Sequence, residues 1–241
     1  MNDPSTEPAT SPLSLQDRTV LVSGGASGLG AAVAVAVQVA GGTPVVLDRR
    51  APEASWPFHQ VDLADTAATE QAVHAVINEH GGLDAVVTCA GIDLPAPLTD
   101  LPAADWERIL RVNLLGTVAV VRAALPSLLE RQGRVVTVAS TLGHGVAGDA
   151  SAYCASKWGV VGFTRALTAE LRGRLGITLL TPGGMATAFF DQRQDQYKPP
   201  ADLQLCDPLD VAETVVFALT RPPGCEVKEL VVTGPNEASW P

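Results

Sequence analysis

The stretch Thr19–Gly30, with the sequence TVLVSGGASGLG, decides the fold of this chain. Its first five residues are mostly aliphatic or β-branched, as in a strand that is buried on both faces of a parallel sheet. Glycines follow at positions 24, 25, 28 and 30, and the segment AAVAVAVQVA comes directly after them. This segment predicts a helix. A strand that enters a helix through a glycine-rich turn is the first half of a βαβ unit.

The same alternation of short β-branched runs and longer Ala/Leu-rich segments continues along the chain. We expect strands at Thr19–Ser23, Thr43–Leu47, Phe58–Val61, Asp84–Thr88, Arg134–Ala139, Gly176–Leu180 and Glu229–Thr233. We expect helices at about 28–40, 66–80, 103–131, 151–173 and 208–220. Alternation of this kind predicts an α/β fold, a doubly wound sheet with helices on both faces. With no internal repeat or linker, residues 15–241 are predicted to form one Rossmann-type domain.

Composition and charge exclude several classes of function. The chain has 241 residues, 46% of them apolar, and a net charge of −10. It has no basic stripe to neutralise phosphates, so neither nucleic acid nor an anionic membrane is expected as a partner. The four cysteines and four histidines lack metal-ligand spacing, so no metal site is predicted. Free thiols are typical of a reducing cytosol, and we expect a cytoplasmic protein.

The N-terminal segment has neither the basic start nor the apolar centre that a signal peptide has. Residues 1–14 are polar and rich in Pro, Ser and Thr, and they are predicted to form a flexible tail. No apolar run reaches membrane-spanning length without interruption by Gly, Pro or a charged residue.

The glycine-rich turn predicts a site for the phosphates of a dinucleotide. Glycines permit the tight turn and let the backbone approach a pyrophosphate, and the helix N-terminus offers free N–H groups. A tight turn without a ligand is the alternative. Asp48 ends the second predicted strand, where a carboxylate accepts hydrogen bonds from the ribose hydroxyls of NAD. Arg49 and Arg50 follow, and an arginine can hold the 2′-phosphate of NADP. These residues favour NAD and leave NADP as the alternative.

The segment SAYCASK at 151–157 predicts a chemical pair. Tyr153 and Lys157 are four residues apart and share one face of the predicted helix. A cation beside a phenol stabilises the phenolate, so the tyrosine could exchange protons near neutral pH. A half-buried helix that uses an amphipathic tyrosine and a snorkelling lysine would show the same spacing.

Together these motifs resemble those of the short-chain dehydrogenase/reductase family, over residues from about 17 to 234. Ser23–Gly30 is similar to the family's Thr-Gly-x-x-x-Gly-x-Gly, with Ser in place of Thr. Asp62-Leu63 matches an Asp-apolar pair that contacts adenine in the family. Thr88–Gly91, with the sequence TCAG, stands where the family usually has Asn-Asn-Ala-Gly. Ala90 and Gly91 are kept, whereas both asparagines are replaced.

The resemblance implies a fold, a site and an assembly. The fold implied has seven parallel strands in the order 3-2-1-4-5-6-7, and the assembly is a homodimer or homotetramer through the helices at 103–131 and 151–173. Pro182-Gly183, with Thr187 downstream, resembles the segment that covers the nicotinamide. The implied catalytic residues are Asn113, Ser140, Tyr153 and Lys157. The predicted cofactor-binding residues are Ser23, Gly24, Ser27, Gly28, Leu29, Gly30, Asp48, Arg49, Asp62, Leu63, Ala90, Gly91, Tyr153, Lys157, Pro182, Gly183 and Thr187.

The chemistry of an alcohol dehydrogenase assigns each catalytic side chain a task. Tyr153 takes or gives the proton, and Lys157 lowers the pKa of the phenol and donates to the nicotinamide ribose. Ser140 donates to the substrate oxygen, where charge develops. Asn113 is expected to hold a water that passes protons to Lys157.

The segment 184–206 follows the sixth predicted strand and is expected to form a lid over the substrate. Apolar residues in or near it predict an uncharged, hydrophobic secondary alcohol or ketone as substrate. The predicted substrate-binding residues are Leu142, Val146, Met185, Phe189 and Phe190, to which Leu94 and Tyr197 could add. Arg193 is the one candidate to pair with a substrate carboxylate, and His144 and Cys154 are expected to be a loop residue and a core thiol.

The functional prediction is therefore NAD-dependent oxidation of such an alcohol, or the reverse reaction. The alternatives are a biosynthetic NADP-dependent ketoreductase, an enoyl reductase or dehydratase, and a non-catalytic protein that senses a cofactor on the same fold.

Overall fold

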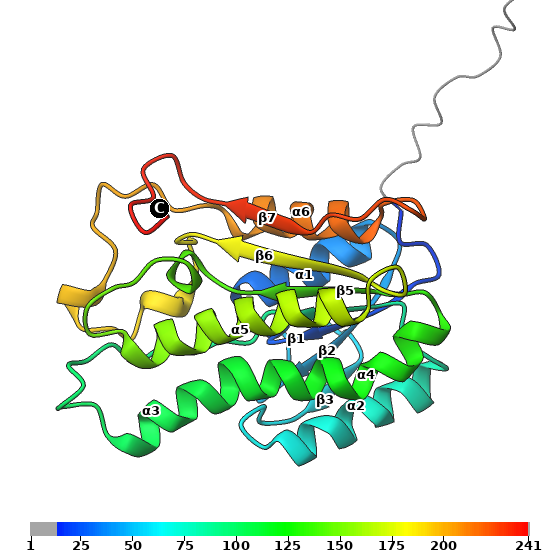
Figure 1. The fold of residues 1–241 in the computed structure, drawn as a ribbon, viewed down its shortest axis with the longest axis horizontal. Coiled ribbons are helices and arrows are strands. Elements are labelled where there is room, and N and C mark those ends of the chain that lie inside the picture. The colour runs from blue at the N-terminus through cyan, green and yellow to red at the C-terminus, as the bar shows by residue number, and fades with distance from the viewer. Residues whose placement is uncertain (1–13, 241) are drawn as a thin grey trace, which may run out of the picture.

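The computed structural model describes residues 14–240, and its centre is one parallel sheet (Figure 1). The strand order is β3-β2-β1-β4-β5-β6-β7, and every pair is parallel, which confirms the predicted topology. The strands are β1 (Thr19–Ser23), β2 (Thr43–Asp48), β3 (Phe58–Gln60), β4 (Ala85–Thr88), β5 (Arg134–Val138), β6 (Gly176–Pro182) and β7 (Glu229–Val232). Of the predicted tail, residues 1–13 lie outside the described residues.

Helices cover both faces of the sheet, as the alternation of elements predicts. The α-helices are α1 (Gly28–Val39), α2 (Thr66–His80), α3 (Ala103–Leu110), α4 (Thr117–Glu130), α5 (Ser151–Glu170) and α6 (Pro208–Leu219). Helices α1 and α6 pack together on one face, and α2, α4 and α5 lie on the other (Figure 1). The start of α6 is the one that the sequence predicts, because Asp207 accepts a hydrogen bond from the Leu209 amide at 2.8 Å and Pro208 occupies the first turn.

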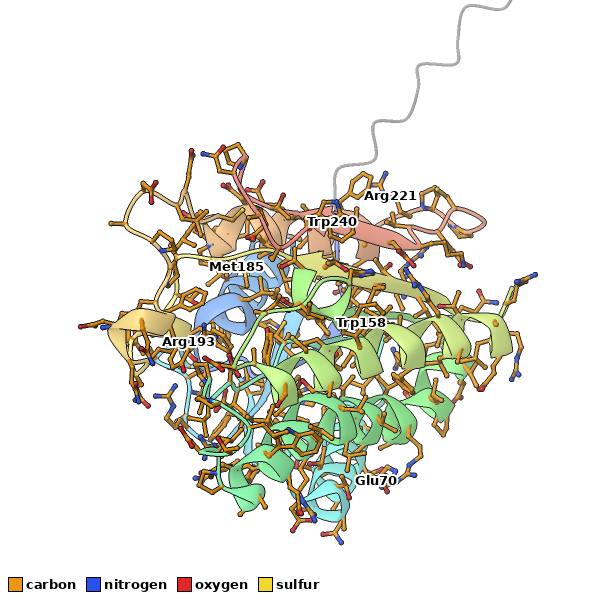
Figure 2. All side chains as sticks on the ribbon, turned by 60° about the vertical axis from the view of Figure 1, so that its left-hand side comes forward. Glu70, Trp158, Met185, Arg193, Arg221 and Trp240 are labelled. Atoms are coloured by element: carbon orange, nitrogen blue, oxygen red, sulfur yellow. The ribbon has the colours of Figure 1, made fainter. Side chains whose placement is uncertain are left out.

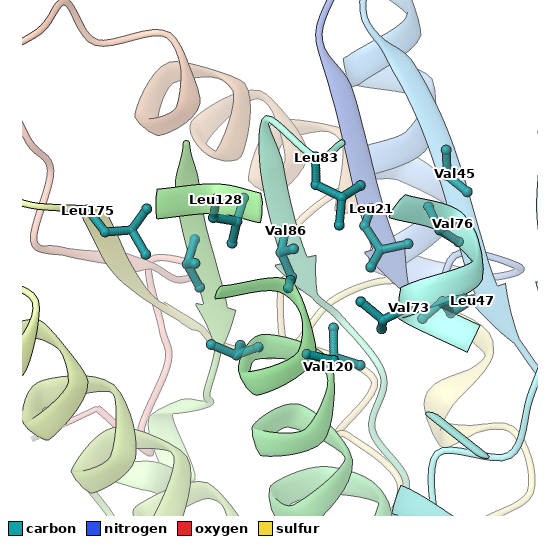
Figure 3. Packing of buried hydrophobic residues seen from close by; sticks show 14 of the residues in the cluster. Leu21, Val45, Leu47, Val73, Val76, Leu83, Val86, Val120, Leu128 and Leu175 are labelled. Carbon is teal, nitrogen blue, oxygen red and sulfur yellow. The ribbon is translucent and has the colours of Figure 1, made fainter. Parts of the chain in front are cut away.

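The sheet separates two hydrophobic clusters. On the face of α2 and α4, Leu21, Leu83 and Val86 of the sheet region meet Val120 and Leu128 (Figure 3). All five are fully buried. On the opposite face, alternate residues of the same strands pack on α1 and α6. Strands with both faces buried explain why their sequences are continuous apolar runs instead of alternating ones.

The predicted helix over 103–131 is interrupted in the structure. The six residues Arg111–Gly116 form a π-helical segment, η1, between α3 and α4. A π-bulge adds a residue to one turn and often occurs at functional sites. It brings Asn113 to 0% exposure. Helix propensity does not predict this bulge, because its cause is a set of long-range hydrogen bonds that Asn113 makes.

The helical stretch Ala103–Glu130 is also long and apolar enough to cross a membrane by length and composition. The same test is passed by core helices of water-soluble proteins. Here 61% of its most apolar window is buried inside the fold, as in a core helix.

Candidate active site

The glycine-rich turn between β1 and α1 has the backbone that the sequence predicts for it. Gly24 and Gly28 have φ angles of 73° and 53°, which L side chains rarely adopt. A Cβ atom at Gly30 would lie 2.1 Å from the Gly24 carbonyl oxygen, so this position requires glycine for the helix to pack on the turn. Within residues 14–240, the Ser27 side chain makes no capping hydrogen bond to α1. The Ser27 side chain therefore leaves the first-turn N–H groups of α1 uncapped, as phosphate binding at this helix N-terminus would require.

Asp48 and Arg50, the two side chains that could decide between NAD and NADP, both bond to the glycine-rich turn. The two carboxylate oxygens of Asp48 accept hydrogen bonds from the backbone amides of Ala26 and Arg50, each at 3.1 Å. Each oxygen keeps a free lone pair for a ribose hydroxyl. The Arg50 guanidinium donates to the Ser27 hydroxyl at 3.3 Å. A carboxylate and a guanidinium thus share one site, whereas the Arg49 side chain is exposed beside it.

At the adenine end, Asp62 follows β3 and is held in place by two donors. Its carboxylate accepts from Arg108 at 2.8 Å and from the Ala64 amide at 3.0 Å. Burial raises the pKa of Asp62, but the Arg108 and Ala64 hydrogen bonds and the charges of Arg108 and Arg49 outweigh it, and the net shift is downward. The carboxylate therefore stays charged at neutral pH. Leu63 beside it is buried.

Tyr153 and Lys157 lie in the first two turns of α5. The Lys157 ammonium is 5.7 Å from the centroid of the Tyr153 ring, so the two side chains share a face of the helix. Lys157 is 4% exposed, and its Nζ donates to the Val138 carbonyl at 3.0 Å. Gly91 lies in the segment that follows β4, residues 89–92, which we call the β4 turn. A Cβ atom at Gly91 would lie 3.6 Å from this Nζ, so the β4 turn borders the pair. The lysine is therefore enclosed and held, as a positioned catalytic group must be.

The pKa values of this pair differ from the sequence-based expectation. Burial raises the pKa of Tyr153 to about 12, an effect that the neighbouring Ser140 hydroxyl opposes and the charge of Asp93 reinforces. Burial lowers the pKa of Lys157 to about 8, against the opposing charge of Cys89. Burial thus outweighs the Ser140 hydrogen bond, which lowers the pKa of the phenol. The expected stabilisation of the phenolate depends on the charge of Lys157 together with the positive charge of an oxidised nicotinamide, and it stays a prediction.

Asn113 occupies a structural position between the β4 turn and α5. Its side-chain amide donates to the Ile92 carbonyl at 2.9 Å and to Ser156 Oγ at 3.0 Å, and its Oδ1 accepts from the Ile92 amide at 2.8 Å. Ser156 Oγ in turn donates to the Tyr153 carbonyl at 2.7 Å. The side chain thus ties the β4 turn to the catalytic helix, and its geometry makes it a positioning residue.

Ser140 lies two residues after the end of β5 and next to the Tyr153 hydroxyl. Its Oγ accepts a hydrogen bond from the Leu142 amide at 3.2 Å. The side chain is 9% exposed. Since one backbone amide fixes the oxygen as an acceptor, the hydroxyl proton is free to point at a substrate oxygen.

The segment that resembles the nicotinamide cover is held by a residue that the sequence-based reasoning missed. Glu237 Oε2 accepts from the Gly184 amide at 2.8 Å, and a Cβ atom at Gly183 would lie 2.6 Å from the same oxygen. Ser239 Oγ lies 2.6 Å from both Glu237 Oε1 and Thr141 Oγ1. Thr141 adjoins Ser140, so this chain of hydrogen bonds joins the cover to the catalytic serine. No motif signals Glu237.

Thr187 closes the opposite end of the cover. A Cβ atom at Gly28 would lie 3.6 Å from the Thr187 side chain, so the cover and the glycine-rich turn border one space. Glycine at position 28 keeps that space open. Among the predicted cofactor residues, Ser23, Gly24, Leu29, Ala90 and Pro182 are buried or half-buried around it.

The predicted substrate residues separate into two groups. Phe189 belongs to the first, since its ring centroid is 6.0 Å from that of Tyr153 and 5.4 Å from that of Phe190. Met185 and Leu142 are half-buried near the site. Val146 belongs to the second group because it is 77% exposed, and Leu94 is 47% exposed. Phe189 itself is 37% exposed, so its contact with Tyr153, more than burial, distinguishes the first group.

Arg193 is paired inside the protein. Its Nη2 donates to Asp93 Oδ2 at 2.7 Å, and its Cζ lies 5.0 and 4.7 Å from the ring centroids of Phe189 and Phe190. Asp93, two residues after Gly91, was not among the predicted site residues. Burial raises the pKa of Asp93, and the Arg193 charge opposes that rise. Because its charge is already neutralised, Arg193 is a poor receptor for a substrate carboxylate.

Three weaker sequence features have definite places. His144 is half-buried, with Nε2 3.2 Å from Thr181 Oγ1 and its ring 5.2 Å from that of Trp240. Cys154 is buried and all four cysteines are free. In the part of the chain that the structure describes, no cluster of His, Cys, Asp or Glu could hold a metal ion.

Comparison with known proteins points to one family. The family described as short chain dehydrogenase matches residues 18–198. An uncharacterized oxidoreductase of Staphylococcus aureus (strain MW2) is 30% identical over 230 residues, which are 90% of this chain and 97% of that protein. The glycine betaine reductase ATRR of Emericella nidulans is also 30% identical, but the match covers only 19% of its length.

Solved structures with the same fold include several dehydrogenases. The aldohexose dehydrogenase of Thermoplasma acidophilum in ligand-free form superposes with a TM-score of 0.83 at 23% identity, over 91% of this chain and 94% of that one. An alcohol dehydrogenase of Thermococcus sibiricus, complexed with 5-hydroxy-NADP, gives a TM-score of 0.80 at 22% identity, over 89% and 95%. At these identities the likeness shows the fold alone.

Proposed function

The chain belongs to the short chain dehydrogenase family, and on that premise we propose that it oxidises an uncharged, hydrophobic secondary alcohol to a ketone with NAD, or catalyses the reverse reaction. The observation that carries this proposal is the enclosed group of Tyr153, Lys157 and Ser140 beside a glycine cradle. Tyr153 and Lys157 lie on α5 and Ser140 lies in the loop after β5, so two elements of the fold assemble the group.

The side chains divide the chemistry of alcohol oxidation between them. A bound nicotinamide supplies the acceptor for the hydride that leaves the carbinol carbon. Tyr153 takes the hydroxyl proton as its phenolate, and because burial raises the pKa of its phenol, this phenolate must be stabilised by positive charge nearby. The Lys157 charge and the positive charge of an oxidised cofactor act in that direction. Ser140 donates to the substrate oxygen, and Asn113 holds α5 in register with the β4 turn.

The substrate is proposed to be uncharged because the candidate cation of its pocket is already neutralised. Arg193 is paired with Asp93, whose side chain is 4% exposed. Phe189 supplies an aromatic wall next to Tyr153. A substrate carboxylate would have to compete with Asp93 for the guanidinium and would leave a buried carboxylate unpaired, which is costly.

Asp48 supports NAD, and Arg50 supports the alternative of an NADP-dependent ketoreductase. Both side chains reach the glycine-rich turn, Asp48 through the Ala26 amide and Arg50 through Ser27. A carboxylate at this position favours NAD, because it can accept hydrogen bonds from the ribose hydroxyls and repels a 2′-phosphate.

The test is reduced-nicotinamide formation with a panel of apolar secondary alcohols, run with NAD and NADP separately. We expect turnover with NAD to exceed turnover with NADP. Asp48→Ala should relax this preference, and Arg50→Ala should weaken the NADP reaction selectively. A wild type that prefers NADP, with Arg50→Ala abolishing that preference, would establish the ketoreductase alternative. Tight NAD binding without turnover of any alcohol would favour a cofactor-sensing protein.

We further propose that the protein forms a dimer or tetramer through α4, α5 and the neighbouring π-helix. Leu115 on the π-helical segment and Trp158 on α5 are apolar side chains that are 45% and 50% exposed, and such an assembly would bury them. Light scattering of the purified protein tests this proposal, and a monomer at micromolar concentration would contradict it.

A further inference from the structure

The buried ion pair between Asp93 and Arg193 is incompletely bonded. Asp93 Oδ1 and Arg193 Nε are both buried, and neither has a hydrogen-bond partner among residues 14–240. Buried polar atoms without a partner are rare and costly, so each such atom in a native fold calls for an explanation. Here Asp93 Oδ1 is an acceptor and Arg193 Nε is a donor.

The two atoms belong to the matching halves of one ion pair. In an arginine, Nε–H and one Nη2–H point in the same direction and bind a carboxylate as a fork. Arg193 uses Nη2 for Asp93 Oδ2 at 2.7 Å but leaves Nε unused. The corresponding oxygen, Asp93 Oδ1, is the one that is left over. The pair therefore forms only one of the two parallel hydrogen bonds of such a fork. The bond from Nη2 to Oδ2 is made, and the bond from Nε to Oδ1 is not.

A second ion pair in the same protein shows the closed form. Arg165 Nε donates to Glu229 Oε1 at 2.8 Å and Nη2 donates to Oε2 at 3.1 Å, so both tines are used. Both of its side chains are about half exposed, at 55% and 42%. The fork is thus complete at the surface, where water could satisfy its atoms, and open in the interior, where water is scarce. Poor packing does not explain that contrast, because Arg193 also stacks on two aromatic rings.

The open fork lies beside the reacting groups. Arg193 is 5.0 Å from the Phe189 ring, which is 6.0 Å from the Tyr153 ring. Asp93 follows the β4 turn that borders Lys157. Arg193 and Met185 both belong to the segment that follows β6, and Figure 2 shows them on the same side of the molecule.

We propose that the open fork between Asp93 and Arg193 binds a second, neutral polar group of the substrate, and that this group is a hydroxyl. A hydroxyl is both a donor and an acceptor, so one such group satisfies Asp93 Oδ1 and Arg193 Nε together. The substrate class is then a diol, or the corresponding hydroxyketone, with an otherwise apolar skeleton. This inference rests on the proposed function and sharpens it, because sites built to bind a hydroxyl reject the analogue that lacks it.

The experiment compares hexan-2-ol with the hexanediols that carry a second hydroxyl at each of the other carbons. Two quantities are measured for each alcohol. One is its Kd for enzyme loaded with oxidised cofactor, by calorimetry, and the other is its kcat/KM from reduced-nicotinamide formation. At least one diol is expected to have a Kd about tenfold or more lower, and a kcat/KM about tenfold or more higher, than hexan-2-ol. Arg193→Lys keeps a cation for Asp93 but has no Nε–H fork, and it should reduce this ratio to about one. Arg165→Lys is the matched control and should leave the ratio unchanged.

The outcomes separate the two proposals. Diols that bind no more tightly than hexan-2-ol would overturn the inference and leave an ordered water as the occupant of the fork. A diol preference that survives in Arg193→Lys would also overturn it. If a diol binds preferentially but no alcohol is turned over, the dehydrogenase proposal fails while the binding site stands. Should Arg193→Lys not fold, the wild-type ratio of Kd values decides alone.

Discussion

The two walls of the active site are held in different ways. The inner wall consists of Asn113, Ser140, Tyr153 and Lys157, and the outer wall is the segment 184–206. In the inner wall, Asn113 and Lys157 are buried and their polar atoms are bonded to backbone groups. In the outer wall, the Asp93–Arg193 pair joins residues 100 positions apart and leaves two polar atoms unused. Two side chains of the inner wall thus have their polar atoms bonded within the protein, whereas the Asp93–Arg193 pair keeps two polar atoms without a partner among residues 14–240.

The largest effect is expected in the inner wall, from loss of the proton acceptor. Tyr153→Phe should reduce kcat by about 10²–10⁴-fold, the range for general acid–base groups, because no other side chain can take the proton. Cofactor Kd should change little, since the ring and its contact with Phe189 remain. Steady-state rates and calorimetric titration measure both quantities. Wild-type turnover in this variant would disprove the mechanism.

The next effect is a pH dependence of stability that belongs to Lys157. Its pKa is 10.5 in the unfolded chain and about 8 in the fold. Below pH 8 both states carry the proton, and the cost of burying the charge is fully present. Between pH 8 and 10.5 only the unfolded state keeps the proton, so stability rises with pH by up to about 1.4 kcal/mol per pH unit.

Lys157→Met removes this contribution. The free energy of unfolding of the wild type, relative to Lys157→Met, should therefore rise between pH 8 and 10 in denaturant titrations. Lys157→Arg is the control, since a guanidinium stays charged over that range. Parallel pH profiles for the wild type and Lys157→Met would show that burial does not shift this lysine.

The Tyr153–Lys157 pair and the glycine-rich turn could be predicted from the sequence, because each depends on the spacing of residues that are close together in the chain. Tyr153 and Lys157 are one helical turn apart, and the glycines at 24, 28 and 30 follow a strand at once. The fold followed from the same kind of local pattern. Asp93 and Glu237 could not be predicted, because each acts through a partner at least 50 positions away. The interruption at Arg111–Gly116 was missed for the same reason: the bonds that cause it reach Ile92 and Ser156.

A smaller effect is expected where the nicotinamide cover meets Glu237. Glu237→Ala removes the acceptor of the Gly184 amide and should raise the Kd for the cofactor by about three- to tenfold, because the cover is less ordered. The kcat at saturating cofactor should change less than the Kd. Glu229→Ala, at an exposed carboxylate on β7, is the matched control. Equal effects of the two substitutions would show that Glu237 has no role in ordering the cover.

The smallest effects distinguish the residues of the outer wall from their neighbours. Phe189→Ala should raise KM for an apolar substrate by about three- to tenfold, because an aromatic surface beside Tyr153 is lost. Val146→Ala should change KM by less than about twofold, since this side chain is 77% exposed. Both are measured with one alcohol at saturating cofactor. A larger effect at Val146 would mean that the substrate extends over the loop after η2 (Thr141–Gly143).

The hydrogen bonds of Glu237 and Ser239 have a consequence for how the protein is made. A chain grows from its N-terminus at about 5–20 residues per second, and early segments begin to fold while later ones are still being synthesised. The glycine-rich turn and the catalytic helix leave the ribosome well before residue 237 does. The nicotinamide cover can be fastened only afterwards, when Ser239 reaches Thr141 across 98 positions. On a growing chain the hydrogen bonds of the cover are therefore among the last of the site that can form, because they need residues 237 and 239.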